Sequence, residues 1–223
     1  MPEDFKRIVE QTADGSHTLF VPALNEHYHS VNGAVQEALH VFLDAGLKHC
    51  NKSELDVFEV GFGTGLNAFL TAKYAEQEDV KIHYTSIEAF PLSEEITSKL
   101  NYATEADREL YLALHTAEWG REVEITANFS LTKIEADFTN FDFFHFSETF
   151  DVIYFDAFAP DVQSDMWSQD IFNKMYQIAQ ADAIMTTYCA KGEVRRRMQS
   201  AGFIVERIPG PPGKREMLRA RKL

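Results

Sequence analysis

The chain has 223 residues, a formal net charge of −14, a hydrophobic fraction of 45% and two cysteines. This length and composition suit one well-packed α/β domain with an N-terminal addition, and they exclude a disulfide framework and a strongly basic protein. No apolar run reaches the length of a bilayer, and the first residues lack the apolar core of a signal peptide. We therefore expect a cytoplasmic protein without a membrane partner.

The charge is unevenly distributed along the chain. Residues 191–223 contain ten Lys or Arg and three acids, a local balance of +7, so the first 190 residues carry −21. The net acidity alone argues against a nucleic-acid partner, whereas a segregated cationic end is compatible with docking of a phosphate backbone. A solvated basic helix and hairpin would give the same pattern, and both interpretations stand at this point.

The chain is organised around residues 55–70, LDVFEVGFGTGLNAFL. Residues 55–60 have the apolar, β-branched and aromatic composition of a buried parallel strand, and a helix is predicted from Thr64 or Gly65 onward. Between them, Gly61, Gly63 and Gly65 permit unusual backbone angles and let a ligand approach the main chain. This combination favours a nucleotide-type cradle, the alternative being a turn that only packs a helix closely on a strand.

The glycine spacing and the acid before it indicate which nucleotide is bound. The dinucleotide fingerprint receives a pyrophosphate, whereas here the turn is one residue tighter and Glu59 precedes Gly61 by two positions. An acid at that point would repel a pyrophosphate, but it suits the cationic amino group and sulfonium of S-adenosylmethionine. We therefore expect S-adenosylmethionine as the cofactor, and a nicotinamide enzyme is disfavoured.

Two further carboxylates are predicted at the same edge of the sheet. Residues 80–88 are predicted as the second strand, with Glu88 at the carboxyl end, where a carboxylate can accept hydrogen bonds from ribose hydroxyls. A strand-like run at 133–137 ends at Asp137, a candidate partner for the adenine amine. Trp119, in a helical region predicted at 104–122, is expected in the core or an interface rather than against a base.

A second functional focus follows the strand predicted at 151–155. Asp156 ends this strand and is expected beside the glycine turn, because neighbouring parallel strands present their carboxyl ends to one crevice. Its carboxylate can accept an N–H bond from a substrate amine, orient the lone pair and take up a proton. Phe158 and Tyr154 are candidates for stacking on a nucleobase. The alternative is a strand-capping Asp with a packed Phe.

The remaining elements complete the predicted α/β architecture. Residues 1–50 are expected as an N-terminal extension and residues 51–223 as the main domain. His27 and His29 have no third ligand in a recognisable spacing, so no metal is expected. The extension is predicted to contain a strand at 18–21, a loop at 23–30 and a helix at 34–47 capped by Asn32. The C-terminal part is predicted to contain a phenylalanine-rich packing segment at 138–150, a helix from Met166, a strand at 183–189, a helix at 191–201 stopped by Gly202, and an antiparallel hairpin.

Several separate segments resemble one family. They are ALNEHYHSVNGAVQEALHVFL, EVGFGTGLNAFL, the strand end at Glu88, YFDAFAPDVQSDMW, TTYCAKGEVRRRMQSAGF and GPPGKREML. Together they span nearly the whole chain and resemble the methyltransferase component of the MnmC-type tRNA modification enzymes. The resemblance implies a Rossmann-like class I methyltransferase fold, a mostly parallel sheet closed by the hairpin. It also implies S-adenosylmethionine-dependent N-methylation of an aminomethyl group on carbon 5 of a wobble uridine, often also thiolated, in tRNA.

The resemblance also implies roles for individual residues. Asp156 would face the amine, with Phe158 beside it. Tyr28 and Ser30 match a loop that closes over the site, and Lys214 and Arg215 would reach RNA or the uridine. Within that loop Glu26 and His29 replace the Asp and Phe that the family often has, so its detailed contacts are expected to differ. Cofactor contacts are implied for Glu59, Gly61, Gly63, Thr64, Gly65, Glu88, Asp137 and Asp156.

Bifunctional members of the family continue into a flavin-dependent oxidase domain, whereas this sequence stops at Leu223. We therefore expect no flavin, and an aminomethyl substrate prepared by upstream tRNA-modifying enzymes. Two other functions remain alternatives: an aminopropyl transferase of the spermidine synthase type, whose strand resembles DVIYFDAF, and a non-catalytic cofactor- or RNA-binding subunit. The sequence does not specify the tRNAs, the need for thiolation, a separate flavin oxidase partner, or whether the protein is a monomer or a dimer.

Overall fold

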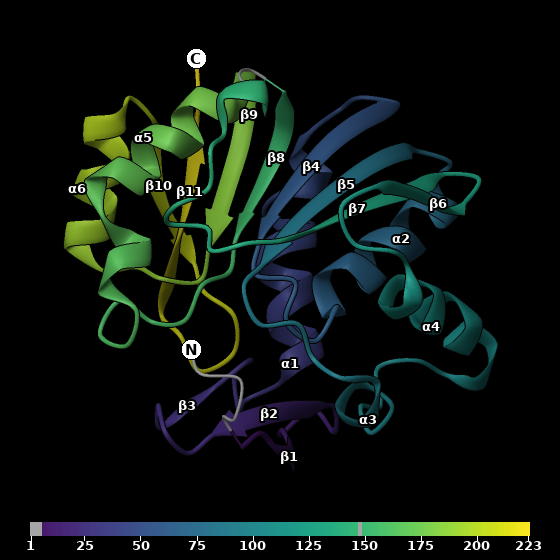
Figure 1. Cartoon of the computed structure of the whole chain (residues 1–223). Coiled ribbons are helices and arrows are strands. Elements are labelled where there is room, and N and C mark those ends of the chain that lie inside the picture. Colours follow the sequence, from purple (N-terminus) through teal and green to yellow (C-terminus); the bar gives the residue numbers. More distant parts are fainter. Residues whose placement is uncertain (1–5, 147–148) are drawn as a thin grey trace.

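The structure, a computed structural model, describes residues 6–146 and 149–223. An eight-stranded sheet with helices on both faces forms its centre, and a separate three-stranded sheet lies below it in Figure 1. The strands of the large sheet, in spatial order, are β10 (Ile204–Pro209), β11 (Glu216–Arg221), β9 (Ala179–Thr187), β8 (Phe150–Phe155), β4 (Glu54–Val60), β5 (Lys81–Glu88), β7 (Phe129–Glu135) and β6 (Glu122–Thr126).

The central strands of this sheet are parallel. Strands β9, β8, β4, β5 and β7 all run in the same direction, whereas β11, β10 and β6 are antiparallel to their neighbours. The chain passes from β4 outward to β5 and β7 and then returns to β8 on the other side of β4. Ligands of such sheets bind beyond the carboxyl ends of the strands at this switch point. The predicted α/β fold, with its C-terminal antiparallel hairpin, is confirmed.

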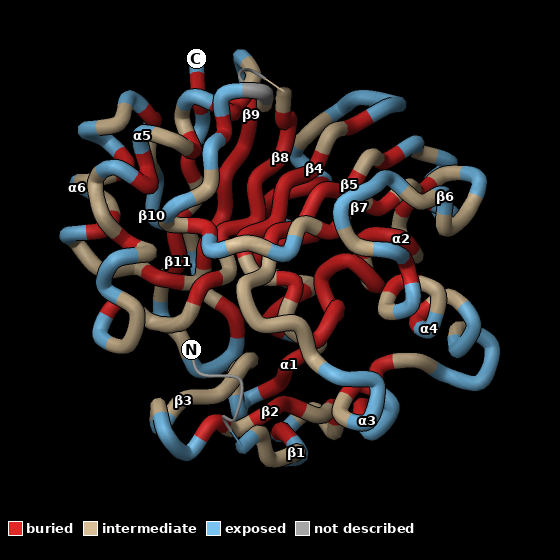
Figure 2. Tube along the Cα trace, viewed as in Figure 1, coloured by how far each residue is buried: buried red, intermediate tan, exposed pale blue. Residues whose placement is uncertain are grey.

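Two layers of helices cover the sheet, and the strands between them are buried along most of their length (Figure 2). Side chains alternate between the two faces of a strand. Val57 of β4 accordingly packs in the cluster that contains Phe69, and Phe58 packs in the cluster that contains Phe172. The helices are α1 (Ala34–Ala38), α2 (Leu66–Glu78) and α4 (Arg108–Thr116) on one side, α5 (Gln169–Ile178) and α6 (Gly192–Ala201) on the other, and the short α3 (Glu94–Thr97).

The phenylalanine-rich segment packs against one face of the large sheet. The rings of Phe138, Phe143 and Phe150 surround Phe58 with centroid distances of 6.4, 5.7 and 4.9 Å. Residues 147 and 148 of this segment lie outside the described residues. The aromatic cluster closes the face of β4 and β8 opposite α2.

The N-terminal segment differs in detail from the prediction. It forms the small antiparallel sheet of β1 (Ile8–Gln11), β2 (His17–Val21) and β3 (Glu26–His27). The single helix predicted over 34–47 is replaced by α1, a π-helical segment (Leu39–Asp44) and a 3-10 turn (Leu47–His49). The predicted cap is wrong: Gly33, at φ 145°, precedes α1, and its neighbour Asn32 packs against Gly213, where an added Cβ would lie 2.0 Å from Asn32 Nδ2.

The helical region predicted at 104–122 is also shorter than expected. It consists of a 3-10 turn (Glu105–Asp107) and α4, which ends where Ala117 becomes extended. Trp119 then lies against the ammonium of Lys133, which is 4.7 Å from the indole centroid and donates to the carbonyl oxygens of Leu114 and His115. Trp119 therefore packs on the protein core, as expected.

The basic C-terminal residues are largely paired within the protein. Lys191 pairs with Asp161, Arg207 with Glu216, Lys214 with Glu37, Arg219 with Glu206 and Arg221 with Asp182, and Lys222 donates to the carbonyl oxygens of Tyr176 and Ala179. Three of these acids, Glu37, Asp161 and Asp182, come from outside residues 191–223, whereas Glu206 and Glu216 belong to the same hairpin as their partners. Arg196 and Arg215 are exposed.

Candidate active site

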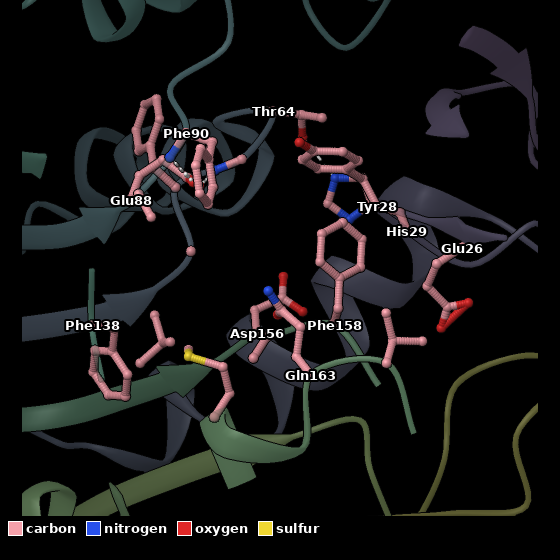
Figure 3. Close-up of a pocket in the computed structure, with 18 of the residues that line it drawn as sticks. Glu26, Tyr28, His29, Thr64, Glu88, Phe90, Phe138, Asp156, Phe158 and Gln163 are labelled. Atoms are coloured by element: carbon pink, nitrogen blue, oxygen red, sulfur yellow. Dashed lines mark hydrogen bonds between the residues drawn. The ribbon is translucent and has the colours of Figure 1, made fainter. Parts of the chain in front are cut away.

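A cavity of about 630 Å³ opens at the carboxyl edge of the parallel strands. In Figure 3, Glu88 and Phe90 stand on one side of it, Tyr28 and His29 on the opposite side, and Asp156 between them. Three predicted site residues, Glu59, Gly65 and Arg215, do not line this cavity. The predicted residues that do line it are Tyr28, Ser30, Gly61, Gly63, Thr64, Glu88, Asp137, Asp156, Phe158 and Lys214.

The glycine turn forms the floor of the cavity. Gly61 and Gly63 have φ angles of 89° and 49°, a region that side chains disfavour. A Cβ on Gly61 would lie 3.0 Å from the carbonyl oxygen of Asp156, and one on Gly63 would lie 3.2 Å from the Tyr28 ring. The absence of side chains therefore lets the backbone of β4, the end of β8 and the covering loop come together.

Glu88 connects the end of β5 to the glycine turn. Its Oε2 accepts the N–H of Gly63 at 3.0 Å, and its Oε1 accepts the N–H of Phe90 at 2.8 Å. A carboxylate has about four acceptor positions, so both oxygens can still accept ribose hydroxyls. Asp137 lines the same end of the cavity, and it accepts hydrogen bonds from Thr139 and Asn140.

Glu59 lies beneath the cavity and not in its wall. Its side chain is 0% exposed, and Oε2 accepts the hydroxyl of Ser86 at 2.7 Å. Side-chain alternation along β4 points Glu59, like Val57, toward α2. Burial raises the pKa of Glu59 to about 8, so this carboxyl is mostly neutral at pH 7. Glu59 therefore does not reach the cavity, and its contact with the cofactor stays a prediction that the cavity lining does not support.

Gly65 also lies behind the cavity wall and does not line the cavity. It precedes α2 with φ 71°, and a Cβ there would lie 2.9 Å from Nε2 of His115. This backbone angle and the packing of α4 account for a glycine at this position, and the cofactor contact of Gly65 stays a prediction.

Asp156 stands in the cavity wall at the end of β8. Asn67, in the first turn of α2, donates from Nδ2 to Oδ2 of Asp156 at 2.9 Å. Burial raises the pKa of Asp156 to about 7, and the negative Glu37 adds to the rise, while Asn67 and Lys214 oppose it. A carboxyl with a pKa near 7 can both accept and release a proton at neutral pH.

The two aromatic residues predicted to stack on a nucleobase, Phe158 and Tyr154, lie in different surroundings. Phe158 lines the cavity and meets Tyr28 edge to face, with ring centroids 5.1 Å apart. Tyr154 is 0% exposed, and its hydroxyl lies 3.3 Å from Thr71 Oγ1 in the core. The prediction that Tyr154 could stack on a nucleobase is therefore wrong, because its side chain points toward α2.

The loop at residues 26–31 covers the glycine turn. Nε2 of His29 lies 2.6 Å from Oγ1 of Thr64, and Arg7 donates to the Tyr28 hydroxyl at 3.2 Å. Burial lowers the pKa of His29 to about 4, so the imidazole is neutral at pH 7. The family that the sequence resembles often has Phe at this position. In this chain, His29 instead connects the loop to the glycine turn by a hydrogen bond.

Three residues of the cavity wall were missed from the sequence. Glu37 accepts the Ser30 N–H and pairs with Lys214, Asn67 holds Asp156, and Tyr188 donates to the Ala157 carbonyl. Tyr188 follows β9 at the same carboxyl edge, so the rule that found Asp156 could have found it. Asn67 could have been noticed as a polar residue in an apolar helical run.

The cavity is strongly acidic. Among the described residues that line it are six carboxylates and one lysine: Glu26, Glu37, Glu88, Asp137, Asp156, Asp165 and Lys214. Such walls disfavour a pyrophosphate and suit a cationic ligand. They fit S-adenosylmethionine, since the bare glycine backbone leaves room for the nucleoside, Glu88 can accept ribose hydroxyls, and a negatively charged wall would attract the sulfonium and amino group.

Residues 6–146 and 149–223 contain neither a candidate metal site nor a helix that could span a membrane. No three His, Cys, Asp or Glu residues gather there in a way that could hold a metal ion. The helices in these ranges are also too short or too polar to cross a membrane.

Comparison with known proteins gives the family. The model of an S-adenosyl-L-methionine-dependent methyltransferase family matches residues 102–223. Over 226 residues the chain is 32% identical to the tRNA 5-methylaminomethyl-2-thiouridine biosynthesis bifunctional protein MnmC of Burkholderia multivorans, covering 90% of this chain and 33% of that protein. The protein of the same name from Campylobacter hominis is 33% identical over 171 residues, covering 74% of this chain and 25% of its own length. The chain thus spans about a third or less of these relatives.

Solved structures agree on the fold. MnmC2 from Aquifex aeolicus superposes with a TM-score of 0.80 at 23% identity, covering 98% of this chain and 71% of that one. Spermidine synthase from Thermotoga maritima superposes with a TM-score of 0.59 at 13% identity, covering 98% of this chain and 75% of that one. At these identities the likeness shows the fold alone.

The cavity is acidic, and the glycine turn forms its floor. Together with the fold, this is typical of a protein that binds a cationic nucleoside at the carboxyl edge of a parallel sheet. The chain belongs to the family of S-adenosyl-L-methionine-dependent methyltransferases, whose model matches more than half of its length. The predicted enzyme class and cofactor are thereby confirmed.

Proposed function

We propose that this methyltransferase N-methylates the aminomethyl group on carbon 5 of the wobble uridine, or 2-thiouridine, in tRNA. The observation that carries the proposal is Asp156, a carboxylate held by Asn67 in the wall of the cofactor cavity and next to the glycine turn. The names of the MnmC relatives point to the same substrate. Upstream enzymes would install the aminomethyl group, and we place the reaction in the cytoplasm.

Several residues of the cavity would take part in methyl transfer, each in a different role. When bound, S-adenosylmethionine supplies an electrophilic methyl group on its sulfonium. Asn67 holds one oxygen of Asp156 and leaves the other for an N–H of the substrate amine. Asp156 would orient the lone pair of the amine nitrogen and accept the proton that this nitrogen loses when it is methylated. A positioned group of this kind contributes about 10²–10⁴-fold to a rate.

Other side chains would hold the substrate base and backbone. Phe158 and Tyr28 form an aromatic wall of the cavity, suited to a flat uracil ring. Arg215 is exposed in the hairpin loop next to Lys214, where it can meet a phosphate of the tRNA. Because the protein as a whole is acidic, this docking depends on few cations and should weaken with added salt.

The test is transfer of labelled methyl from S-adenosylmethionine to bulk tRNA that lacks methylaminomethyl groups, followed by nucleoside analysis. We expect label in methylaminomethyl-uridine nucleosides. Cofactor binding without tRNA labelling would refute the tRNA proposal. Polyamines should be supplied in parallel, together with decarboxylated S-adenosylmethionine, because product formation there would favour the aminopropyl-transfer alternative.

A further inference from the structure

Glu37 is a buried carboxylate of the cavity wall that the proposed chemistry does not use. It lies in α1, is 7% exposed, and binds two distant segments. Its Oε2 accepts the backbone N–H of Ser30 at 2.8 Å, and its Oε1 accepts Nζ of Lys214 at 2.6 Å. Desolvation offsets much of the attraction in a buried ion pair, so general stability is a weak reason for placing one here.

Lys214 extends this contact toward the proposed proton acceptor. Its ammonium lies 3.8 Å from the centroid of the Tyr188 ring, a cation–π distance. The Tyr188 hydroxyl donates to the carbonyl oxygen of Ala157 at 2.9 Å, and Ala157 directly follows Asp156. Contacts therefore run from Glu37 through Lys214 and Tyr188 to the end of β8.

The same ion pair joins two loops at the cavity. Ser30 belongs to the loop at 26–31, which also holds Tyr28 against Gly63 and His29 against Thr64. Lys214 belongs to the hairpin loop at 210–215, in which its N–H donates to the Pro211 carbonyl at 2.9 Å. The covering loop and the hairpin loop, which are far apart in the sequence, are thus bound to one carboxylate.

We propose that Glu37 is a positioning residue for methyl transfer, which through Lys214 fixes the two loops against each other and sets the electrostatic field at Asp156. This inference rests on the proposed function, in which Asp156 accepts the amine proton. The field has two opposed parts, since the negative Glu37 raises the pKa of Asp156 and the positive Lys214 lowers it. The other polar groups that act on Asp156 or are acted on by it are Asn67, Glu59, Tyr84 and Tyr188.

The test uses Glu37→Gln, Lys214→Met and the double variant in the full chain. Gln can still accept the Ser30 N–H, and Met keeps an unbranched stem over Tyr188, so each change removes mainly the charge. Lys48→Met is the matched control, because Lys48 pairs with Asp44 at 2.7 Å and lies 6.0 Å from the Tyr74 ring, all outside the cavity lining. Methyl-transfer kinetics, cofactor affinity and thermal unfolding would be measured for each variant.

Each single change should lower kcat/KM for the amine substrate at least about tenfold, with a raised KM for the amine. The double variant should be no worse than the poorer single variant, because both changes break one interaction. Lys48→Met should match the wild type. Multiplicative losses, or a Glu37→Gln enzyme with wild-type kcat/KM, would overturn the proposal.

A second readout does not depend on turnover. The titration of Asp156, followed by carbon NMR of its labelled carboxyl, should move to lower pH in Glu37→Gln and to higher pH in Lys214→Met, each by about half a unit or more. A purely structural role would not produce opposite shifts, and shifts of the same sign or none would contradict the inference. If the wild type methylates no amine, the proposed function fails, whereas the titration still decides the coupling.

Discussion

Replacement of Asp156 by Asn should make the protein more stable and almost inactive. In the folded protein, burial raises the pKa of Asp156 from 3.8 to about 7. Each unit of pKa shift corresponds to about 1.4 kcal/mol, so the ionised carboxylate lowers the free energy of unfolding by up to about 4 kcal/mol above pH 7. Asn removes that charge, has nearly the same size and can still accept the hydrogen bond from Asn67.

The size of this effect depends on pH, whereas its sign does not. Between about pH 4 and pH 7, folded Asp156 keeps a proton that the unfolded chain has released, so its contribution to stability falls as the pH rises through this window. At pH 8 the wild type carries the whole destabilisation. At about 2–4 °C per kcal/mol for a chain of this length, the variant should unfold several degrees higher, and the difference should shrink toward pH 5.

Thermal unfolding at pH 8 and pH 5 and methyl-transfer rates check both halves of the prediction. The variant should keep cofactor binding and lose about 10²-fold or more in kcat. Asp151→Asn is the matched control on the same strand, because Asp151 is paired with Lys52 and accepts the Asp56 N–H, so its loss should destabilise the protein. An Asp156→Asn protein that unfolds at a lower temperature than the wild type at pH 8, or that keeps wild-type turnover, would refute the reasoning.

Three further predictions follow from the same site. The methyl-transfer rate should rise with pH to a plateau, with a midpoint near 7, because Asp156 must be ionised to accept the proton, and a flat pH profile would contradict this. Glu59→Gln should leave the cofactor affinity measured by calorimetry unchanged, whereas Glu88→Gln should weaken it about tenfold; equal losses would place Glu59 in the binding site after all. Gly65→Ala should lower the free energy of unfolding in urea by about 1–3 kcal/mol, and more than Gly120→Ala, which has a similar φ but no neighbour within 4 Å of the added Cβ.

The sequence could predict the edge of the sheet where the chemistry lies. Apolar strand patterns located β4, β5 and β8, and the rule that parallel strands share one carboxyl edge brought Glu88 and Asp156 to the glycine turn. The direction of each side chain needed the register as well. Glu59 is opposite Tyr154 in the ladder, and both side chains point to the face of α2, so neither reaches the cavity.

The remaining parts depend on packing between distant segments. Glu37 belongs to the cavity because α1 lies against the hairpin loop, and nothing in the local pattern around residue 37 specifies a partner at Lys214. Asn32 has the local chemistry of a helix cap, but the tertiary contact with Gly213 takes its side chain away from α1. Likewise, Lys191, Lys214 and Arg221 of the basic C-terminal end meet acidic partners from distant segments only when the chain folds.

We propose that the cavity binds S-adenosylmethionine with its methyl group directed at an amine beside Asp156. The most direct measurement is a crystal structure of the complex with S-adenosylhomocysteine. We predict that the ribose hydroxyls lie at Glu88, that the nucleoside backs onto Gly61 and Gly63, and that the sulfur faces the free oxygen of Asp156. A nucleoside bound elsewhere, or a sulfur directed away from Asp156, would contradict the account.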